Sequence, residues 1–177
     1  DSAPAPLLTL IVGPSDETKA IGRAKQEFSE RHDIRHGFWT QFLEYAKTKT
    51  QLHGSITPSK YHWIATGAGK GGLTYNYVVF EHETAVELYI DRGKGADEEN
   101  KAIFDALLAK KADIEKVFGE DLEWQRLDTK RASRIRKKLA HGGWKDQAKW
   151  PDADRVTVDA MIRLEKALKP HIQKLSV

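Results

Sequence analysis

The sequence predicts an α+β fold, in which long helices pack on an antiparallel sheet of about five strands in the order α-βββ-α-ββ-α. Three observations support this prediction. Apolar residues recur at three- and four-residue spacing in the first 50 residues, after Asp97 and after Trp150, which is typical of helices. Between residues 61 and 91 the pattern changes to short runs rich in β-branched and aromatic residues. The connections between these runs are too short for parallel crossovers.

Composition limits the class of protein. A chain of 177 residues suits one domain, which we expect to span residues 15–177, after an extended lead-in or interdomain linker at 1–14. The chain has no cysteine, which excludes disulfides and thiol chemistry. It has no apolar run long enough for a membrane span and no export signal. We therefore expect a soluble, cytoplasmic protein that does not associate with membranes.

The first predicted helix follows Gly13-Pro14. Ser15 is a candidate N-cap, and Asp16 and Glu17 place negative charge in the first turn, where it complements the helix dipole. The pattern fits one helix to about Thr50 or two helices with a break near Asp33. Its apolar stripe consists of Ile21, Ala24, Phe28, Phe38, Trp39, Phe42, Leu43 and Ala46.

Three strands are predicted next, at residues 61–66, 73–81 and 84–91. A glycine-rich loop at 67–72 joins the first two, and the pair His82-Glu83 joins the second and third. Such short connections favour hairpins, so the three strands form a meander.

The second half begins with a helix predicted from Asp97 to Phe118 and capped by Gly119. A strand follows at 122–127. The segment 130–140 fits either a helix or a strand by its pattern alone. Trp150-Pro151 introduces the last helix, because proline is favoured in a first helical turn.

Positive charge is concentrated in one region. Nine Lys and Arg residues lie between Arg126 and Lys149 against two Asp, so this window carries +7 while the whole chain carries +3. A regional basic stripe indicates a polyanionic partner, usually nucleic acid. The more common explanation of such a stripe is a solvated edge that deters aggregation, and this alternative stays open.

The sequence contains no complete motif for phosphate binding, metal binding or nucleophilic catalysis. Lys70 in the glycine-rich loop is followed by Gly71 and then a strand, which does not fit a phosphate-binding loop. His32 and His36 have metal-ligand spacing but no evident third ligand. No serine lies in a nucleophile motif. We predict no metal, no cofactor and no catalytic residues.

Sequence context predicts the positions of four of the five tryptophans. Trp39, Trp63 and Trp124 are expected to pack in the core. Trp144 stands between Gly143 and Lys145 beside the basic segment and is expected to be exposed, where it can stack on bases.

The element order also matches the core of restriction-endonuclease-like nucleases, which need an Asp followed by (D/E)-x-K to hold magnesium. Glu87-Leu88-Tyr89 has tyrosine at the lysine position, and Asp91-Arg92-Gly93 has glycine there. The order therefore predicts, at most, a nuclease-like scaffold without the catalytic triplet.

A dispersed set of motifs resembles an uncharacterised bacterial and archaeal domain family. The resemblance covers roughly residues 30–175. The motifs are Trp63-Ile64, Tyr75-Asn76-Tyr77-Val78, Val86-Glu87-Leu88-Tyr89-Ile90-Asp91, Glu99-Asn100-Lys101, Phe104-Asp105, Ile114-Glu115, Phe118-Gly119, Leu122-Glu123-Trp124 and Arg131-Ala132-Ser133-Arg134-Ile135. Members of that family often follow RecB- or NucS-like nuclease domains of the PD-(D/E)XK type.

The resemblance implies a module linked to or associated with a nuclease domain that acts in restriction or antiviral defence. It also favours a strand at 131–139, although the chain departs from similar sequences in the basic residues 136–138. As a strand, this segment would place Arg134, Arg136 and Lys138 on one face, about 6.8 Å apart, a spacing that can follow a phosphate backbone.

We therefore expect a non-catalytic accessory module that binds nucleic acid, with DNA as the expected partner. The residues expected to contact it are Lys130, Arg131, Arg134, Arg136, Lys138 and Trp144. One alternative is a protein-interaction or dimerisation module that uses an aromatic sheet face. Another is a small-nucleotide sensor, in which residues 67–72 close a cleft between the sheet and the helices.

Overall fold

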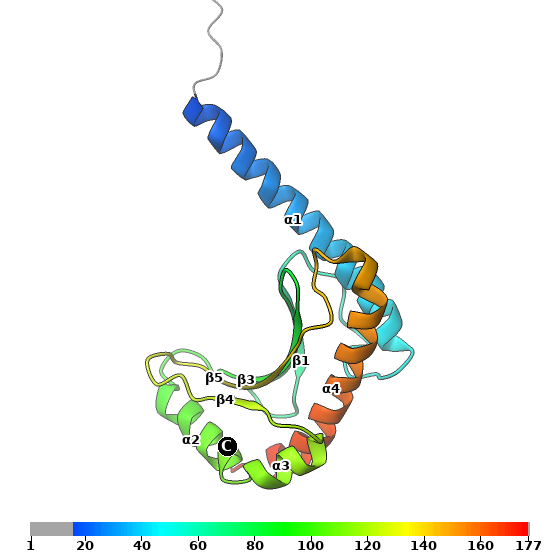
Figure 1. Cartoon of the computed structure of the whole chain (residues 1–177). Helices are drawn as coiled ribbons and strands as arrows, with labels where there is room; N and C mark the ends of the chain where they lie inside the picture. The colour runs from blue at the N-terminus through cyan, green and yellow to red at the C-terminus, as the bar shows by residue number, and fades with distance from the viewer. Residues whose placement is uncertain (1–15, 177) are drawn as a thin grey trace, which may run out of the picture.

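A strongly bent five-stranded sheet with all of its helices on the outer side organises the chain (Figure 1). The computed structural model describes residues 16–176. The elements are α1 (Asp16–Lys47), β1 (Trp63–Gly67), β2 (Leu73–Val79), β3 (Thr84–Ile90), α2 (Asp97–Leu108), α3 (Lys111–Phe118), β4 (Glu123–Gln125), β5 (Ser133–Leu139), a 3-10 turn η1 (Gln147–Lys149) and α4 (Trp150–Gln173). The predicted fold class and order are confirmed. The lead-in at 1–14 and the proposed cap Ser15 lie outside the described residues.

The sheet has the strand order β1-β2-β3-β5-β4, and every neighbouring pair is antiparallel. Its convex face carries the core. Tyr75 and Tyr77 of β2, Leu88 of β3 and Ile135 of β5 are at most 2% exposed. They share one core with Phe42 of α1, whose ring packs edge-on to Tyr77.

Within the segment 130–140, which the sequence left open between helix and strand, residues 133–139 form strand β5. It pairs with β3 along its whole length and with β4 on its other side. Two flanking strands supply hydrogen-bond partners for its backbone, and Ile135 fills the core between them. Pairing of this kind outweighs the residues' equal local fit to a helix.

Helix α1 is continuous, so the alternative of a break near Asp33 is wrong. Its second half packs through Phe38, Trp39 and Phe42, each at most 1% exposed. Residues 16–31 are exposed and project from the body (Figure 1). The predicted apolar stripe is therefore only half buried: Ile21 is 53% exposed and Phe28 57%.

The helix predicted as one unit over 97–118 consists of two. Helix α2 ends at Leu108, and α3 begins at Lys111 after a turn in which the Lys110 amide donates to the Leu107 carbonyl oxygen. The turn lets Phe104 and Phe118 both reach the core beneath the curved sheet. A single straight helix would diverge from the convex face of the sheet and could not bury both rings. Gly119 ends α3 with a φ of 91°, as its predicted capping role requires. No helix within residues 16–176 meets the length and hydropathy that a membrane crossing requires.

A buried carboxyl group joins α1 to α4. Asp154 is 1% exposed, and its Oδ2 accepts a hydrogen bond from Gln41 Nε2 at 2.9 Å, while its Oδ1 has no partner. Burial raises the pKa of Asp154 to about 6 from 3.8. An acid with a raised folded-state pKa stabilises the fold when protonated, so this contribution falls as pH rises from about 4 to about 6.

We expect Asp154→Asn to raise the free energy of unfolding at neutral pH by about 1–2 kcal/mol, because the amide keeps the bond to Gln41 without a buried charge. The gain should vanish below pH 4, where the native acid is protonated. Thermal unfolding of both proteins across this range measures it, and the comparison cancels other groups such as His53, whose burial lowers its pKa to about 4. Asp113→Asn, at an exposed acid, is the control. A gain independent of pH would contradict the assignment.

Candidate nucleic-acid interface

The inner side of the bent sheet, here called the concave face, is covered by none of the helices within residues 16–176 (Figure 1). Strand register arranges its side chains in rows across the sheet. One row runs Ala65, Asn76, Glu87, Arg136 and Glu123, and the next runs Gly67, Thr74, Tyr89, Arg134 and Gln125. A third contains Trp63, Val78, Ala85 and Lys138.

The three cations predicted to share a strand face do so. Arg134, Arg136 and Lys138 are alternate residues of β5 and project onto the concave face. Their side chains are 30%, 12% and 37% exposed, respectively. The three cations therefore share the predicted strand face, although Arg136 is largely covered.

Each of the three has a polar partner. Arg134 Nε donates to Gln125 Oε1 at 2.5 Å, and its Nη1 lies 3.8 Å from Glu87 Oε2. Arg136 Nε donates to Glu123 Oε2 at 2.8 Å. Lys138 forms an ion pair with Glu83 and lies over the Phe80 ring at 5.1 Å. The carboxylates offset the local positive charge, so these cations do not form the uncompensated stripe that the sequence suggested.

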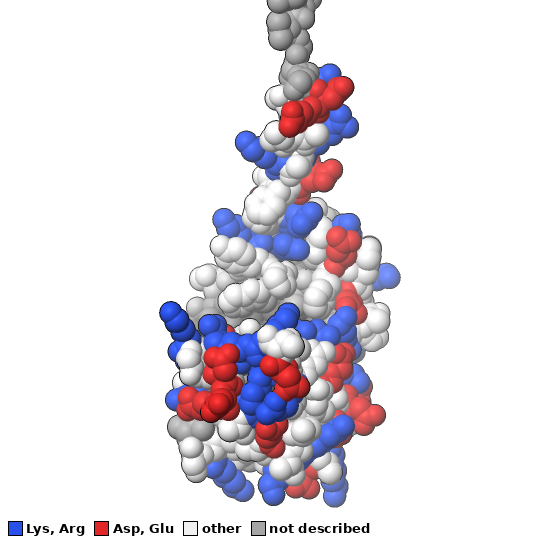
Figure 2. All heavy atoms as spheres, turned by 90° about the vertical axis from the view of Figure 1, so that its left-hand side faces the viewer, with Lys and Arg blue, Asp and Glu red and all other residues white. Residues whose placement is uncertain are grey.

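Figure 2 shows the same pattern from the side toward which the concave face opens. Basic and acidic side chains lie intermixed there, next to a zone without charged residues. Long-range attraction of a polyanion needs an excess of one charge. Binding to this surface would therefore depend more on short-range contacts, to rings and individual hydrogen-bonding groups, than on long-range attraction.

The remaining predicted contacts divide into exposed and buried ones. Lys130 is exposed in the turn before β5 and makes no ion pair with any described residue. Arg131 forms a bidentate pair with Asp91, at 2.7 and 2.6 Å, which lowers the pKa of that carboxyl group. The prediction that Trp144 is exposed is wrong, because its ring is 4% exposed. Its backbone amide donates to the Phe80 carbonyl oxygen, and Arg35 lies over the ring at 5.2 Å.

A hollow of about 470 Å³ occupies the concave face. That volume lies within the range of about 300–1,000 Å³ typical of small-molecule sites. Its lining consists of His62, Trp63, Ala65, Thr74, Asn76, Val78, Phe80, Glu87, Tyr89, Arg134 and Arg136. Four of these side chains are aromatic or imidazole rings, and two are arginines. Trp63, expected in the core, is 46% exposed on edge strand β1, where no helix covers it.

Two polar side chains form the floor of the hollow. Asn76 and Glu87 are cross-strand partners, and each is 6% exposed. Asn76 Nδ2 donates to Glu87 Oε1 at 3.2 Å, which leaves Asn76 Oδ1 buried without a hydrogen-bond donor. Burial raises the pKa of Glu87, while the Asn76 amide and the two arginines act against this rise. Buried acceptors of this kind normally have partners, so the floor is incompletely satisfied.

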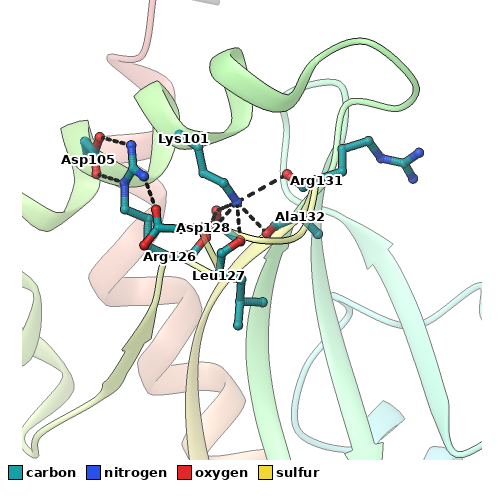
Figure 3. A network of polar contacts seen from close by, with 8 residues as sticks. Lys101, Asp105, Arg126, Leu127, Asp128, Arg131 and Ala132 are labelled. Carbon is teal, nitrogen blue, oxygen red and sulfur yellow. Dashed lines mark hydrogen bonds and ion pairs between the residues drawn. The ribbon is translucent and has the colours of Figure 1, made fainter.

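A buried lysine fixes the edge of this site (Figure 3). Lys101 of α2 points its ammonium group into the turn between β4 and β5. Its Nζ donates to the carbonyl oxygens of Arg126, Leu127 and Ala132 at 2.7, 3.0 and 2.8 Å and to Ser133 Oγ at 3.0 Å. The turn needs these donors because Leu127, with a φ of 57°, directs its backbone out of the sheet ladder.

Two further side chains hold the same turn. Asn100 Nδ2 donates to the Arg131 carbonyl oxygen at 3.2 Å, and its Oδ1 accepts from the Arg92 amide at 2.9 Å. Arg126 forms a bidentate pair with Asp105 of α2, at 2.9 and 3.0 Å. Helix α2 therefore sets the position of the strand that carries Arg134.

Sequence reasoning missed Asn76, Lys101 and the floor role of Glu87. A signal was present for two of them, because a polar Asn and a Glu stand inside otherwise apolar strands, where a buried polar residue is unusual. Lys101 gave none, since its predicted helix tolerates lysine anywhere.

The other candidate sites gain little support. Lys70 donates to the Leu175 carbonyl oxygen at 2.9 Å, which ties the glycine-rich loop to the end of α4. The space between that loop and the helices is a smaller cavity of about 270 Å³. In the part of the chain that the structure describes, no group of three or more His, Asp or Glu residues is placed to hold a metal ion.

Comparisons with known proteins give one match. No match was found among curated proteins or solved structures. The model of a domain of unknown function, DUF4268, matches residues 34–172, which include the whole sheet, most of α4 and the second part of α1. The chain therefore belongs to the DUF4268 family.

Proposed function

We propose that this domain is a non-catalytic module that binds nucleic acid and contacts unpaired nucleotides with its concave face. The observation that carries the proposal is the hollow itself, where Arg134 and Arg136 line the same cavity as Trp63 and Tyr89. Open sheet faces with exposed rings stack bases, and neighbouring arginines contact phosphate.

A single strand suits this face better than a duplex does. Tracking a duplex depends on many unpaired cations, whereas Arg134, Arg136 and Lys138 each have a polar partner here. Unpaired bases can instead enter a hollow and stack on its rings. Lys130, which is exposed beside the hollow, can add a phosphate contact.

The proposed setting is a nuclease-associated protein, in which this module supplies affinity or positioning. That part of the proposal is supported by the resemblance of the motifs described above. The first half of α1 would separate the module from a neighbouring domain by about 24 Å, at 1.5 Å per residue over residues 16–31.

The test is fluorescence anisotropy with labelled single-stranded and duplex DNA, from low to physiological salt. The test variant is Arg134→Gln with Lys138→Gln, because Arg136 is nearly buried. We expect the native protein to prefer the single strand. In the variant, affinity should fall, and the slope of log K against log salt should decrease by about 1.4 if two phosphate contacts are lost.

The control is Arg155→Gln with Lys166→Gln, which removes the same charge from exposed residues of α4 on the other side of the sheet. It should bind as the native protein does. If both variants lose DNA affinity equally, the loss reflects only the change in net charge, which contradicts binding by the concave face. No binding at low salt would overturn the function and move the search to protein partners.

A further inference from the structure

The floor of the hollow lacks donors, and this limits what can bind there. Asn76 Oδ1 is buried without a partner, and its orientation is fixed because the Nδ2 of the same amide donates to Glu87. Glu87 Oε2 lies 3.8 Å from Arg134 Nη1, which is too long for a hydrogen bond. Both side chains line the hollow, so its floor holds two adjacent acceptor groups whose hydrogen bonding is incomplete.

The walls favour a flat ring. Trp63, Phe80 and Tyr89 line the hollow around this floor. Aromatic side chains of this kind hold a base by stacking, which is tolerant of its identity. Identity must then come from the edge of the base that meets the floor.

Among the common bases, guanine alone has two adjacent N–H donors on its pairing edge, at N1 and at the N2 amino group. Adenine and cytosine alternate a donor with an acceptor there, and thymine and uracil place one N–H between two carbonyl oxygens. A floor of two acceptors would leave those bases with an acceptor against Asn76 Oδ1 or the Glu87 carboxylate, which is unfavourable in a buried site.

We propose that the hollow selects a guanine base, whose N1 and N2 donors bind Glu87 and Asn76 while its ring stacks between the aromatic walls. Arg134 and Arg136, which line the same hollow, are placed to donate to the guanine O6 or to the adjoining phosphate. The inference deepens the proposed function and rests on it for the source of the guanine, which is an unpaired nucleotide of a strand.

The first experiment uses the native protein and short oligothymidine strands that differ in one central nucleotide. We expect the strand with guanine to bind about 5- to 150-fold more tightly than strands with adenine, thymine or inosine, the range that one bidentate base contact gives. Inosine is the critical probe because it lacks only the N2 amino group. The analogue 7-deazaguanine keeps the N1 and N2 donors and should bind as guanine does.

Glu87→Gln is the matched variant. It keeps the size of the side chain but replaces one acceptor with a donor, so the ratio of affinities for the guanine strand and plain oligothymidine should fall to about one. Glu83→Gln changes a carboxylate that pairs with Lys138 and does not line the hollow, and it should keep the preference. Thermal unfolding checks that both variants are folded.

The outcomes separate this inference from the proposed function. Equal binding of all strands by the native protein overturns the guanine pocket and leaves nucleic-acid binding standing. Titration with free guanosine monophosphate distinguishes the source of the base. The native protein could bind guanosine monophosphate, with weaker binding in Glu87→Gln, and yet bind no DNA strand. That outcome supports the guanine pocket and overturns the proposed binding of DNA strands. Binding of neither overturns both.

Discussion

Replacing Lys101 by methionine should lower the free energy of unfolding by about 3–5 kcal/mol. The ammonium group lies within hydrogen-bond distance of four backbone carbonyl oxygens, those of Arg126, Leu127, Arg131 and Ala132, and of Ser133 Oγ. Methionine keeps the length of the side chain but donates no hydrogen bond. Among the described residues, only the Ala132 carbonyl oxygen would be left without a donor, which costs about 1–3 kcal/mol, because the Arg126, Leu127 and Arg131 oxygens also accept from Ser133 Oγ, the Lys130 amide and Asn100 Nδ2. These three oxygens would still lose a charge-assisted hydrogen bond, so the total exceeds the effect of an ordinary substitution.

Chemical denaturation of the two proteins measures this loss. Lys166→Met, at an exposed lysine of α4, is the matched control and should change the free energy of unfolding by less than about 0.5 kcal/mol. We also expect the Lys101→Met protein to bind single-stranded DNA more weakly at temperatures where the protein is folded, because the turn before β5 positions Arg134. If the free energy of unfolding changes no more than in the control, water must donate to the carbonyl oxygens of the turn as well as the ammonium group does.

Replacing Gly143 by alanine should lower the free energy of unfolding by about 2–4 kcal/mol. A Cβ at this position would lie 2.3 Å from the Phe80 carbonyl oxygen and 2.6 Å from the Glu81 carbonyl carbon. These are backbone atoms and cannot rotate away. The segment must then withdraw from the β2–β3 turn, which breaks the hydrogen bond from the Trp144 amide to Phe80, at 2.9 Å, and moves a buried indole.

Gly71→Ala is the control, because a Cβ there meets nothing within 4 Å. Its expected effect is neutral or a gain of up to about 1 kcal/mol, from reduced freedom of the unfolded chain. Thermal unfolding of both variants gives the comparison. If the two substitutions have equal effects, the contact between residue 143 and the β2–β3 turn is looser than the structure has it.

Local sequence signals were most reliable where a single element decides the structure. The meander was predicted because short connections leave hairpins as the only solution, and Pro151 marked the start of α4 because its fixed φ suits a first turn. The same reasoning was wrong for Trp144 and Trp63. Their exposure depends on which segment covers them, and no local pattern encodes that.

The candidate site was predicted in part. Arg134 and Arg136 were identified because alternate residues of a strand share a face. Their partners Gln125 and Glu123 come from another strand, and the floor residue Asn76 comes from a third. Three strands set this juxtaposition through their register, which the sequence of any one strand does not contain.

The sequence by itself therefore determined the fold class, the order of the elements and the strand face on which the cations lie, because these depend on periodicity and short connections. Only the tertiary structure decided that the cations have polar partners, that Trp144 is buried and that Asn76 and Glu87 form the floor of a hollow. The physical reason is that charge compensation, burial and cavity shape are properties of side chains brought together from distant segments. They arise when the sheet bends and all the helices pack on its convex side.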